Sequence, residues 1–225
     1  MAAGCTRDQV GERKPRDARL TVHMPKFLLL PPAGLFAPGL LVGGRSAEAR
    51  QRGVGRDVYS WQVISDDGQP ATSTCGLLVC ADSSLSFARE RMRRSISAPA
   101  IVIVRGRNAP APHKQLDAWL RECRNRRSSL VGIGSGTIVL ARAGLAEGRR
   151  CAVHWEQFPI FSERFLGVVA TQTAFEQDGD LYTCAGGDAP FDMFLDLVDH
   201  HHGTTIVNRM CEKAIACRTR SAGDR

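Results

Sequence analysis

Short apolar runs alternate with amphipathic segments through the middle of the chain. Residues 100–104 form a continuous β-branched run, which is typical of a strand covered on both faces of a parallel sheet. Residues 130–133 predict a second strand of this kind. The segment between them carries apolar residues at i, i+3, i+4 and i+7, the pattern of a helix with one buried face. This stripe consists of Leu116, Trp119, Leu120 and Cys123.

The second half of the chain continues the alternation. Residues 165–171 and 181–183 predict strands, and residues 137–143 predict a helix that ends near Gly144. A further helical stripe is formed by Phe191, Phe194, Leu195 and Val198, and a last helix follows Gly203. Strands that alternate with helices predict an α/β fold of the flavodoxin-like type, with a mainly parallel sheet and helices on both faces.

The amino-terminal part of the chain has a different composition. Residues 1–24 have many charges and few large apolar side chains, so we expect a disordered basic leader there. Residues 26–30 predict a buried first strand, residues 46–52 a helix, and residues 58–65 another strand. The apolar run that begins at Phe27 soon meets Pro31 and Pro32. It is therefore too short for a membrane helix or a signal peptide, and we expect a cytoplasmic protein.

Charge and cysteine content narrow the function classes only a little. The net charge of +7 comes partly from basic residues at both ends of the chain, which solvated tails explain better than nucleic-acid binding does. The eight cysteines form no Cys-x-x-Cys pair, so we expect reduced, mostly buried thiols. His200, His201 and His202 are adjacent on a predicted helix and point in different directions, so no metal site is predicted.

A glycine-rich turn joins the strand at 130–133 to the following helix. Its residues Gly132, Gly134, Ser135 and Gly136 lie where ligands bind in open α/β sheets. The turn lacks the last glycine of a dinucleotide fingerprint, because Thr137 stands there, and it lacks the lysine of a phosphate-binding loop. It also misses the hydrolase pattern G-x-S-x-G. Hydrolysis by Ser135 with His154 as the base stays open as an alternative.

Several blocks of the chain resemble one known family. The glycine turn is followed by a helix that ends in Ala141-Arg142-Ala143-Gly144-Leu145, and then by the pair His154-Trp155. Residues 180–187 and the segment from Asp192 to His202-Gly203 match later blocks. Together these blocks resemble the PfpI-like, class I glutamine-amidotransferase-like domain of AraC/XylS-type transcription regulators. The resemblance covers about residues 24–217.

The resemblance implies a sensor and not an enzyme. Enzymes of this superfamily place a nucleophilic cysteine at the strand-to-helix turn, where this chain has Gly134, and an acidic residue near the end of the first strand. No Asp or Glu occurs between Met24 and Ala47. The residues expected to bind an effector are Gly134, Ser135, Gly136, His154, Trp155, Cys184, Gly186 and Gly187. Each also fits a structural role as a tight turn, a packed corner or a helix cap.

The same resemblance suggests an organisation for the whole protein. Residues 25–217 form the sensor domain, and residues 218–225 begin a linker to a helix-turn-helix domain that this chain does not contain. We expect a homodimer that binds a small amino acid or amine without a cofactor and contacts DNA only through that further domain. An alternative interpretation is a dimerisation domain that binds no ligand.

Overall fold

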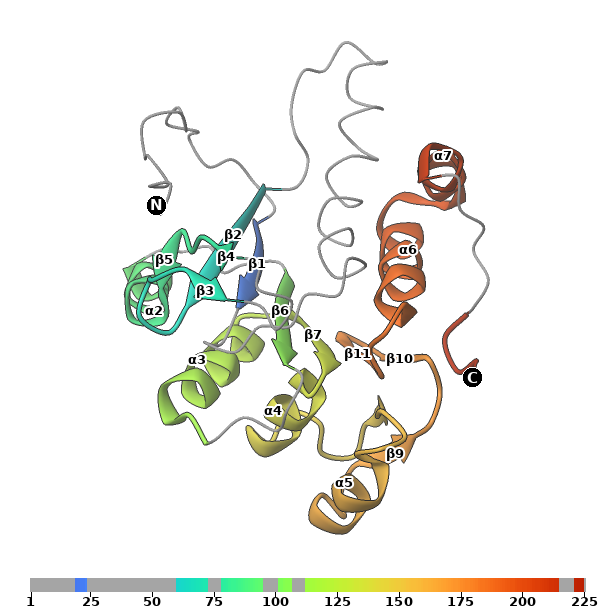
Figure 1. Cartoon of the computed structure of the whole chain (residues 1–225), viewed down its shortest axis with the longest axis horizontal. Coiled ribbons are helices and arrows are strands. Elements are labelled where there is room, and N and C mark those ends of the chain that lie inside the picture. Colours follow the sequence, from blue (N-terminus) through green and yellow to red (C-terminus); the bar gives the residue numbers. More distant parts are fainter. Residues whose placement is uncertain are drawn as a thin grey trace.

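The computed structural model describes residues 19–23, 60–72, 78–94, 101–106, 112–214 and 221–224. Within this part of the chain, a seven-stranded sheet has the order β10-β11-β7-β6-β1-β2-β5 (Figure 1). Adjacent strands of this sheet run parallel except for the pair β10–β11. The strands are β1 (Arg19–His23), β2 (Ser60–Ser65), β5 (Ser83–Ser84), β6 (Ile101–Gly106), β7 (Ser129–Gly134), β10 (Phe175–Asp178) and β11 (Leu181–Cys184).

The β-branched and apolar runs form the strands expected of them. The runs at 100–104, 130–133 and 181–183 correspond to β6, β7 and β11, and the run at 58–65 contains β2. The α/β fold with a mainly parallel sheet is therefore confirmed.

Strand β1 lies within the segment where a disordered leader was expected. Arg19–His23 lies inside residues 1–24, yet it pairs in parallel with both β2 and β6, so the prediction is wrong for these five residues. A central strand is held by backbone hydrogen bonds from two neighbours, which its charged surroundings in the sequence do not reveal. The strand predicted at 26–30 and the helix predicted at 46–52 lie outside the described residues.

Helices cover both faces of the sheet, as expected (Figure 1). They are α2 (Leu85–Arg94), α3 (Lys114–Asn125), α4 (Gly136–Arg142), α5 (Phe158–Arg164), α6 (Ala189–His202) and α7 (Thr204–Ala214). One buried cluster joins Val131 to α6 and α7, and the other joins Leu130 to α2, α3, α4 and α5. Successive residues of a strand point to opposite faces, so β7 contributes to both cores.

The stripe on α3 is buried as its spacing predicts, with Trp119, Leu120 and Cys123 almost inaccessible to solvent. The prediction for residues 165–171 is only partly right. The strand there is limited to β9 (Val169–Thr171), and the phenylalanines before it lie in and beside α5. Their spacing, at 158, 161 and 165, is the i, i+3, i+7 pattern of a helix.

Two small sheets lie outside the main one. Strand β8 (Arg150–Ala152) pairs in parallel with β9, and β3 (Ala71–Thr72) pairs with β4 (Leu78–Val79). Among the described residues, no helix combines the length and the hydropathy that crossing a membrane requires.

Candidate functional site

The glycine turn joins β7 to α4 at the carboxyl edge of the sheet. Gly134 ends β7 with φ of +58°, a left-handed conformation that glycine adopts without strain. Ser135 follows as the residue before α4, and its side chain does not cap the helix. The chain thus reverses from strand to helix within two residues, and the glycine makes the reversal possible.

Gly132 allows the helix to pack closely on the strand. A Cβ atom at this position would lie 3.0 Å from both the backbone nitrogen of Thr137 and Cδ1 of Leu140. Such a distance is shorter than ordinary van der Waals contact between these atoms. The absence of a side chain at Gly132 therefore allows the start of α4 to pack directly against β7.

Two buried hydroxyl groups at this turn have no hydrogen-bond partner among the described residues. They belong to Ser135 and Thr137, whose side chains are both almost inaccessible to solvent. A buried hydroxyl without a partner costs about 1–3 kcal/mol, so a partner that reached either group would stabilise the fold. Thr137 was not among the residues predicted for the site. Its signal in the sequence is a single polar residue at the start of the apolar run 138–141.

The end of β11 meets the same turn. Strands β7 and β11 are parallel neighbours, with Cys184 beside Ile133. Gly186 has φ of +109°, and a Cβ atom on it would lie 3.9 Å from Cα of Gly134. The structure therefore brings together Gly134, Ser135, Gly136 and Gly186, while Gly187 lies next to them and is exposed.

Cys184 is adjacent to the turn in the sheet, but its side chain belongs to the apolar core. It is fully buried in the cluster that includes Val131, Ala189 and Phe194. This location favours the packing interpretation of Cys184 over direct contact with an effector.

His154 follows β8, which runs alongside β11. The backbone amide of Ala152 donates a hydrogen bond to Oγ1 of Thr183 over 2.9 Å. The amide of Arg150 donates to Asp178, which pairs with Leu181 at the start of β11. Strand β8 therefore has the same direction as β11, and its carboxyl end approaches the same edge of the sheet.

His154 and Trp155 occupy different environments. His154 is half-buried, and its Nδ1 accepts a hydrogen bond of 3.3 Å from the backbone amide of Glu156. The indole ring of Trp155 lies 5.6 Å from the imidazole ring, but the residue is 68% exposed. The packed-corner interpretation of Trp155 is therefore wrong, and its side chain is accessible to a ligand or a partner.

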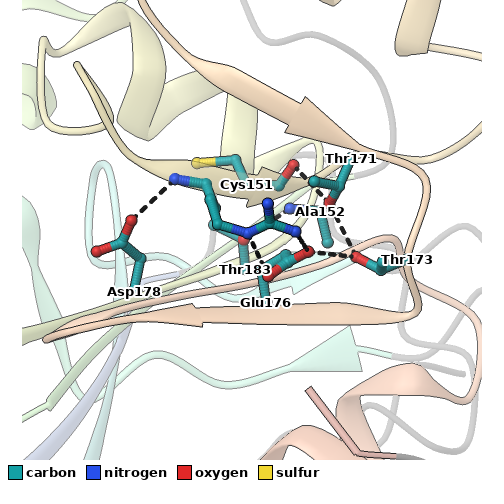
Figure 2. A network of polar contacts seen from close by, with 8 residues as sticks. Cys151, Ala152, Thr171, Thr173, Glu176, Asp178 and Thr183 are labelled. Carbon is teal, nitrogen blue, oxygen red and sulfur yellow. Dashed lines mark hydrogen bonds and ion pairs between the residues drawn. The ribbon is translucent and has the colours of Figure 1, made fainter. Parts of the chain in front are cut away.

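A polar network holds β8 and β9 against the main sheet (Figure 2). Glu176 on β10 is only 4% exposed. Its carboxylate accepts hydrogen bonds from Nη2 of Arg150 at 2.9 Å and from Oγ1 of Thr173 at 3.0 Å. Thr173 is bonded in turn to Thr171 of β9. This network was not predicted, because its members are single polar residues on short strands and in the turn between β9 and β10.

The two acidic residues of β10 have lowered pKa values. Burial raises the pKa of Glu176, but hydrogen bonds from Arg150, Thr171 and Thr173 outweigh it, and the net shift is downward. The backbone amide of Arg150 holds the pKa of Asp178 below its ordinary value, against a smaller effect of burial and with help from Arg149. Both carboxylates are therefore ionised at neutral pH.

Two of the buried thiols, those of Cys123 and Cys151, lack the low pKa of catalytic nucleophiles. Burial raises the pKa of both Cys123 and Cys151 to about 12, so almost none of either thiol is ionised near pH 7. Cys80, Cys123, Cys151, Cys184 and Cys211 are the cysteines of the described residues, and none of these five forms a disulfide.

Thiol labelling tests whether the exposed Cys80 and the buried thiols differ in accessibility. During brief treatment of the native chain with iodoacetamide at pH 8, we expect Cys80 to be alkylated, since it is exposed, while Cys123 and Cys151 stay unmodified. Peptide mass spectrometry measures each site, and labelling in denaturant provides the control in which all three react. Rapid native alkylation of Cys151 would show that the core around β8 is open.

Comparison with known proteins identifies the relatives of this chain. It is 33% identical over 198 residues to the HTH-type transcriptional regulator CdhR of Pseudomonas aeruginosa. The match covers 88% of this chain and 56% of that relative. It is also 33% identical over 178 residues to the HTH-type transcriptional regulator GbdR of the same species, covering 76% of this chain and 45% of that protein. The chain thus spans about half the length of these curated relatives.

Solved structures with the same fold belong to regulators and to other proteins. An AraC family transcriptional regulator from Pseudomonas putida superposes with a TM-score of 0.71 at 22% identity, covering 88% of this chain and all of that one. Drosophila melanogaster DJ-1beta superposes with a TM-score of 0.66 at 14% identity, covering 90% of this chain and all of that one. At these identities the superpositions show the flavodoxin-like fold alone.

The family itself follows from the sequence match. The model of the DJ-1/PfpI family matches residues 41–200, which include the glycine turn, His154-Trp155 and most of α6. The expected resemblance to the PfpI-like domain of AraC-type regulators is confirmed by this match and by the named relatives. The chain belongs to the DJ-1/PfpI family.

Proposed function

We propose that this chain is the effector-sensing domain of an AraC-type transcription regulator and that it catalyses no reaction. The observation that carries the proposal is the turn after β7. Gly134 occupies it in a left-handed conformation, so the turn presents no thiol. The relatives named as transcription regulators support the same role.

The sequence around the first strand also supports a role without catalysis. No Asp or Glu occurs anywhere from Arg19 to Ala47. The end of β1 therefore has no carboxylate next to it in the sequence, and the same holds for the segment 26–30, where the first strand was predicted.

The proposed effector is a small amino acid or amine that binds at the carboxyl ends of β7 and β11. The backbone around Gly134 and Gly186 can approach a ligand closely because neither residue has a side chain. The hydroxyls of Ser135 and Thr137 are buried and have no partner in the described part of the chain, so they would gain hydrogen bonds from it. His154 would border the same edge.

The wider organisation of the protein is part of the proposal. DNA binding would belong to a separate helix-turn-helix domain, as the names of the relatives suggest, and the protein would act in the cytoplasm as a homodimer. An effector would change regulation by binding one arrangement of that dimer more tightly than another.

The rival function is hydrolysis with Ser135 as nucleophile and His154 as base. A serine nucleophile needs a hydrogen bond to its base, but Oγ of Ser135 has no partner among the described residues. Nδ1 of His154 already accepts a hydrogen bond from Glu156. The geometry therefore favours the sensor.

A thermal-shift screen tests the proposal. We expect an amino acid or quaternary amine to raise the melting temperature of the chain, since a ligand at 100 times its Kd adds about 2.7 kcal/mol of stability. Replacing Ser135 by alanine should weaken that binding about fivefold to tenfold through loss of one hydrogen bond. Ser162→Ala is the matched control, because the hydroxyl of Ser162 on α5 is also buried and has no partner within the described ranges.

The same proteins are assayed with a panel of amides and esters. We expect no turnover from the native chain or from either variant. Turnover that disappears in Ser135→Ala would instead establish the hydrolase. A broad metabolite screen in which no compound changes the melting temperature would contradict the effector site.

A further inference from the structure

Helices α2 and α3 carry a large excess of arginine toward their carboxyl ends. Helix α2 has four arginines and one acidic residue, and residues 121–127 have the same numbers. The arginines are Arg89, Arg91, Arg93, Arg94, Arg121, Arg124, Arg126 and Arg127. The net charge of the whole chain is +7, so the surplus of positive charge in these two short segments nearly equals that of the whole chain.

Side-chain contacts bring several of these arginines together. Glu122 of α3 accepts hydrogen bonds from Arg89 and Arg93 of α2, at 2.6 and 3.0 Å. Nη1 of Arg126 donates to the backbone carbonyl of Met92 over 2.8 Å. The carboxyl-terminal parts of α2 and α3 therefore lie side by side, with three guanidinium groups along the seam between them (Figure 1).

The arginines at the end of this seam are accessible to a partner. The side chain of Arg93 is 54% exposed, and that of Arg94, the last residue of α2, is 79% exposed. Arg126 and Arg127 follow α3 directly and are also exposed. We call Arg93, Arg94, Arg126 and Arg127 the arginine surface.

The acidic residues of this region do not cancel its charge. A hydrogen bond from Arg89 holds the pKa of Glu122 below its ordinary value, against the opposing effect of burial. Glu122 is therefore ionised, but it is shared by Arg89 and Arg93. Glu90 pairs with Arg94 on α2 itself. An excess of positive charge remains along the seam.

Stabilisation of the helix ends explains only part of this arrangement. Basic residues in the last turn interact favourably with the helix dipole, but Arg127 lies beyond α3 and has φ of +63°. The amide of Ser128 donates to the carbonyl of Cys123, and the amide of Arg127 donates to that of Arg124. Helices with this pair of bonds usually have glycine where Arg127 stands. The chain thus keeps an exposed arginine at a position that favours glycine.

The arginine surface lies at the opposite edge of the sheet from the candidate effector site. Helix α2 precedes β6 and helix α3 precedes β7, so both helices end near the amino ends of these parallel strands. The glycine turn leaves β7 at its carboxyl end. A partner at the arginine surface would therefore not compete with an effector.

We propose that the arginine surface binds the sugar-phosphate backbone of duplex DNA, beside the segment that a separate helix-turn-helix domain reads. Guanidinium groups bind phosphate through paired hydrogen bonds and stay charged at physiological pH. A duplex carries about one negative charge per 1.7 Å of its axis, so it can engage several neighbouring arginines at once. Phosphate contacts carry no sequence information, so the choice of target would remain with the other domain.

Fluorescence anisotropy with a labelled duplex of arbitrary sequence tests the surface on the full chain. We expect a dissociation constant of about 1–100 µM at about 100 mM salt. The slope of log K against log salt concentration should be about −3, which corresponds to about three phosphate contacts. Binding of this kind needs no operator sequence, because the proposed contacts are to phosphate alone.

Charge reversal locates the binding surface. Arg93→Glu should raise the dissociation constant about tenfold or more and make the salt slope shallower by about 1. Arg164→Glu is the matched control, because Arg164 is exposed on α5 and its reversal changes the net charge equally. This control should change the dissociation constant by less than about twofold, since distant charges are screened by salt. A thermal melt verifies that both variants fold.

Arg127 supplies a second arm that separates binding from structure. Arg127→Gly should weaken DNA binding about threefold or more without lowering the melting temperature, because glycine adopts the left-handed conformation readily. Arg127→Lys keeps the charge and should bind DNA within about twofold of the native chain. If Arg127 only ended the helix, Arg127→Gly would leave the affinity unchanged.

Three results would overturn the inference: no binding of the duplex at about 100 µM chain in low salt, equal losses in Arg93→Glu and Arg164→Glu, or binding of polyglutamate in place of the duplex. The last result would assign the surface to an acidic protein. The inference goes beyond the proposed function and rests on it only for the choice of DNA. An effector-induced thermal shift, measured separately, should be the same in Arg93→Glu as in the native chain. Loss of either activity would therefore leave the other proposal standing.

Discussion

Replacing Trp119 by alanine is expected to lower the free energy of unfolding by about 3–5 kcal/mol, the range for large aromatic residues removed from a packed core. Trp119 is among the largest fully buried side chains of the described residues. It lies on the inner face of α3, in the cluster that also contains Leu140 of α4. Its removal would leave a cavity between these two helices and the sheet.

Urea unfolding followed by circular dichroism measures this loss. Gln115→Ala serves as the control, because Gln115 is exposed on the same helix and its replacement should change stability by less than about 0.5 kcal/mol. A loss below about 1 kcal/mol in Trp119→Ala would mean that α3 does not pack on the sheet as described.

Replacing Glu176 by alanine is expected to lower the free energy of unfolding by about 2–4 kcal/mol. The carboxylate is buried and accepts charge-assisted hydrogen bonds from Arg150 together with one from Thr173. Such bonds contribute more than bonds between neutral groups. Their loss should release β8 and β9 from the main sheet before the rest of the fold opens.

Hydrogen–deuterium exchange localises the effect. We expect faster exchange of the amides of residues 150–153 and 169–171 in Glu176→Ala, with little change in α3. Glu163→Ala is the control, because Glu163 is an exposed acidic residue on the neighbouring α5. Uniform acceleration across the whole chain would contradict a local role for the network.

The same network predicts how stability depends on pH. The pKa values of Glu176 and Asp178 are lowered in the folded chain, so the unfolded chain binds more protons at acidic pH. The stabilisation from these carboxylates is therefore complete above their ordinary pKa of about 4. It is lost as the pH falls through the lowered values. In Glu176→Gln, the decline of stability with acidification should be shallower than in the native chain.

Much of the fold was predictable because its signals are local. The β-branched run at β6 and the four-residue stripe on α3 depend only on spacing along the chain, and the glycine turn after β7 depends on residues next to one another. The phenylalanines around α5 carried an equally local signal that was missed. For the site, this local information predicted Gly134, Ser135 and Gly136, and resemblance to a family added His154 and Trp155.

By itself, the sequence predicted the strands β6, β7 and β11, the buried stripe of α3 and the glycine-rich turn that follows β7. The tertiary structure alone decided that β1 lies inside the sheet, that Glu176 is buried beside Arg150, and that Trp155 is exposed. The physical reason is that burial and pairing depend on which elements dock against one another. The partners of Glu176 lie on β8 and in the turn that follows β9, and no periodicity in one segment specifies its neighbours in space.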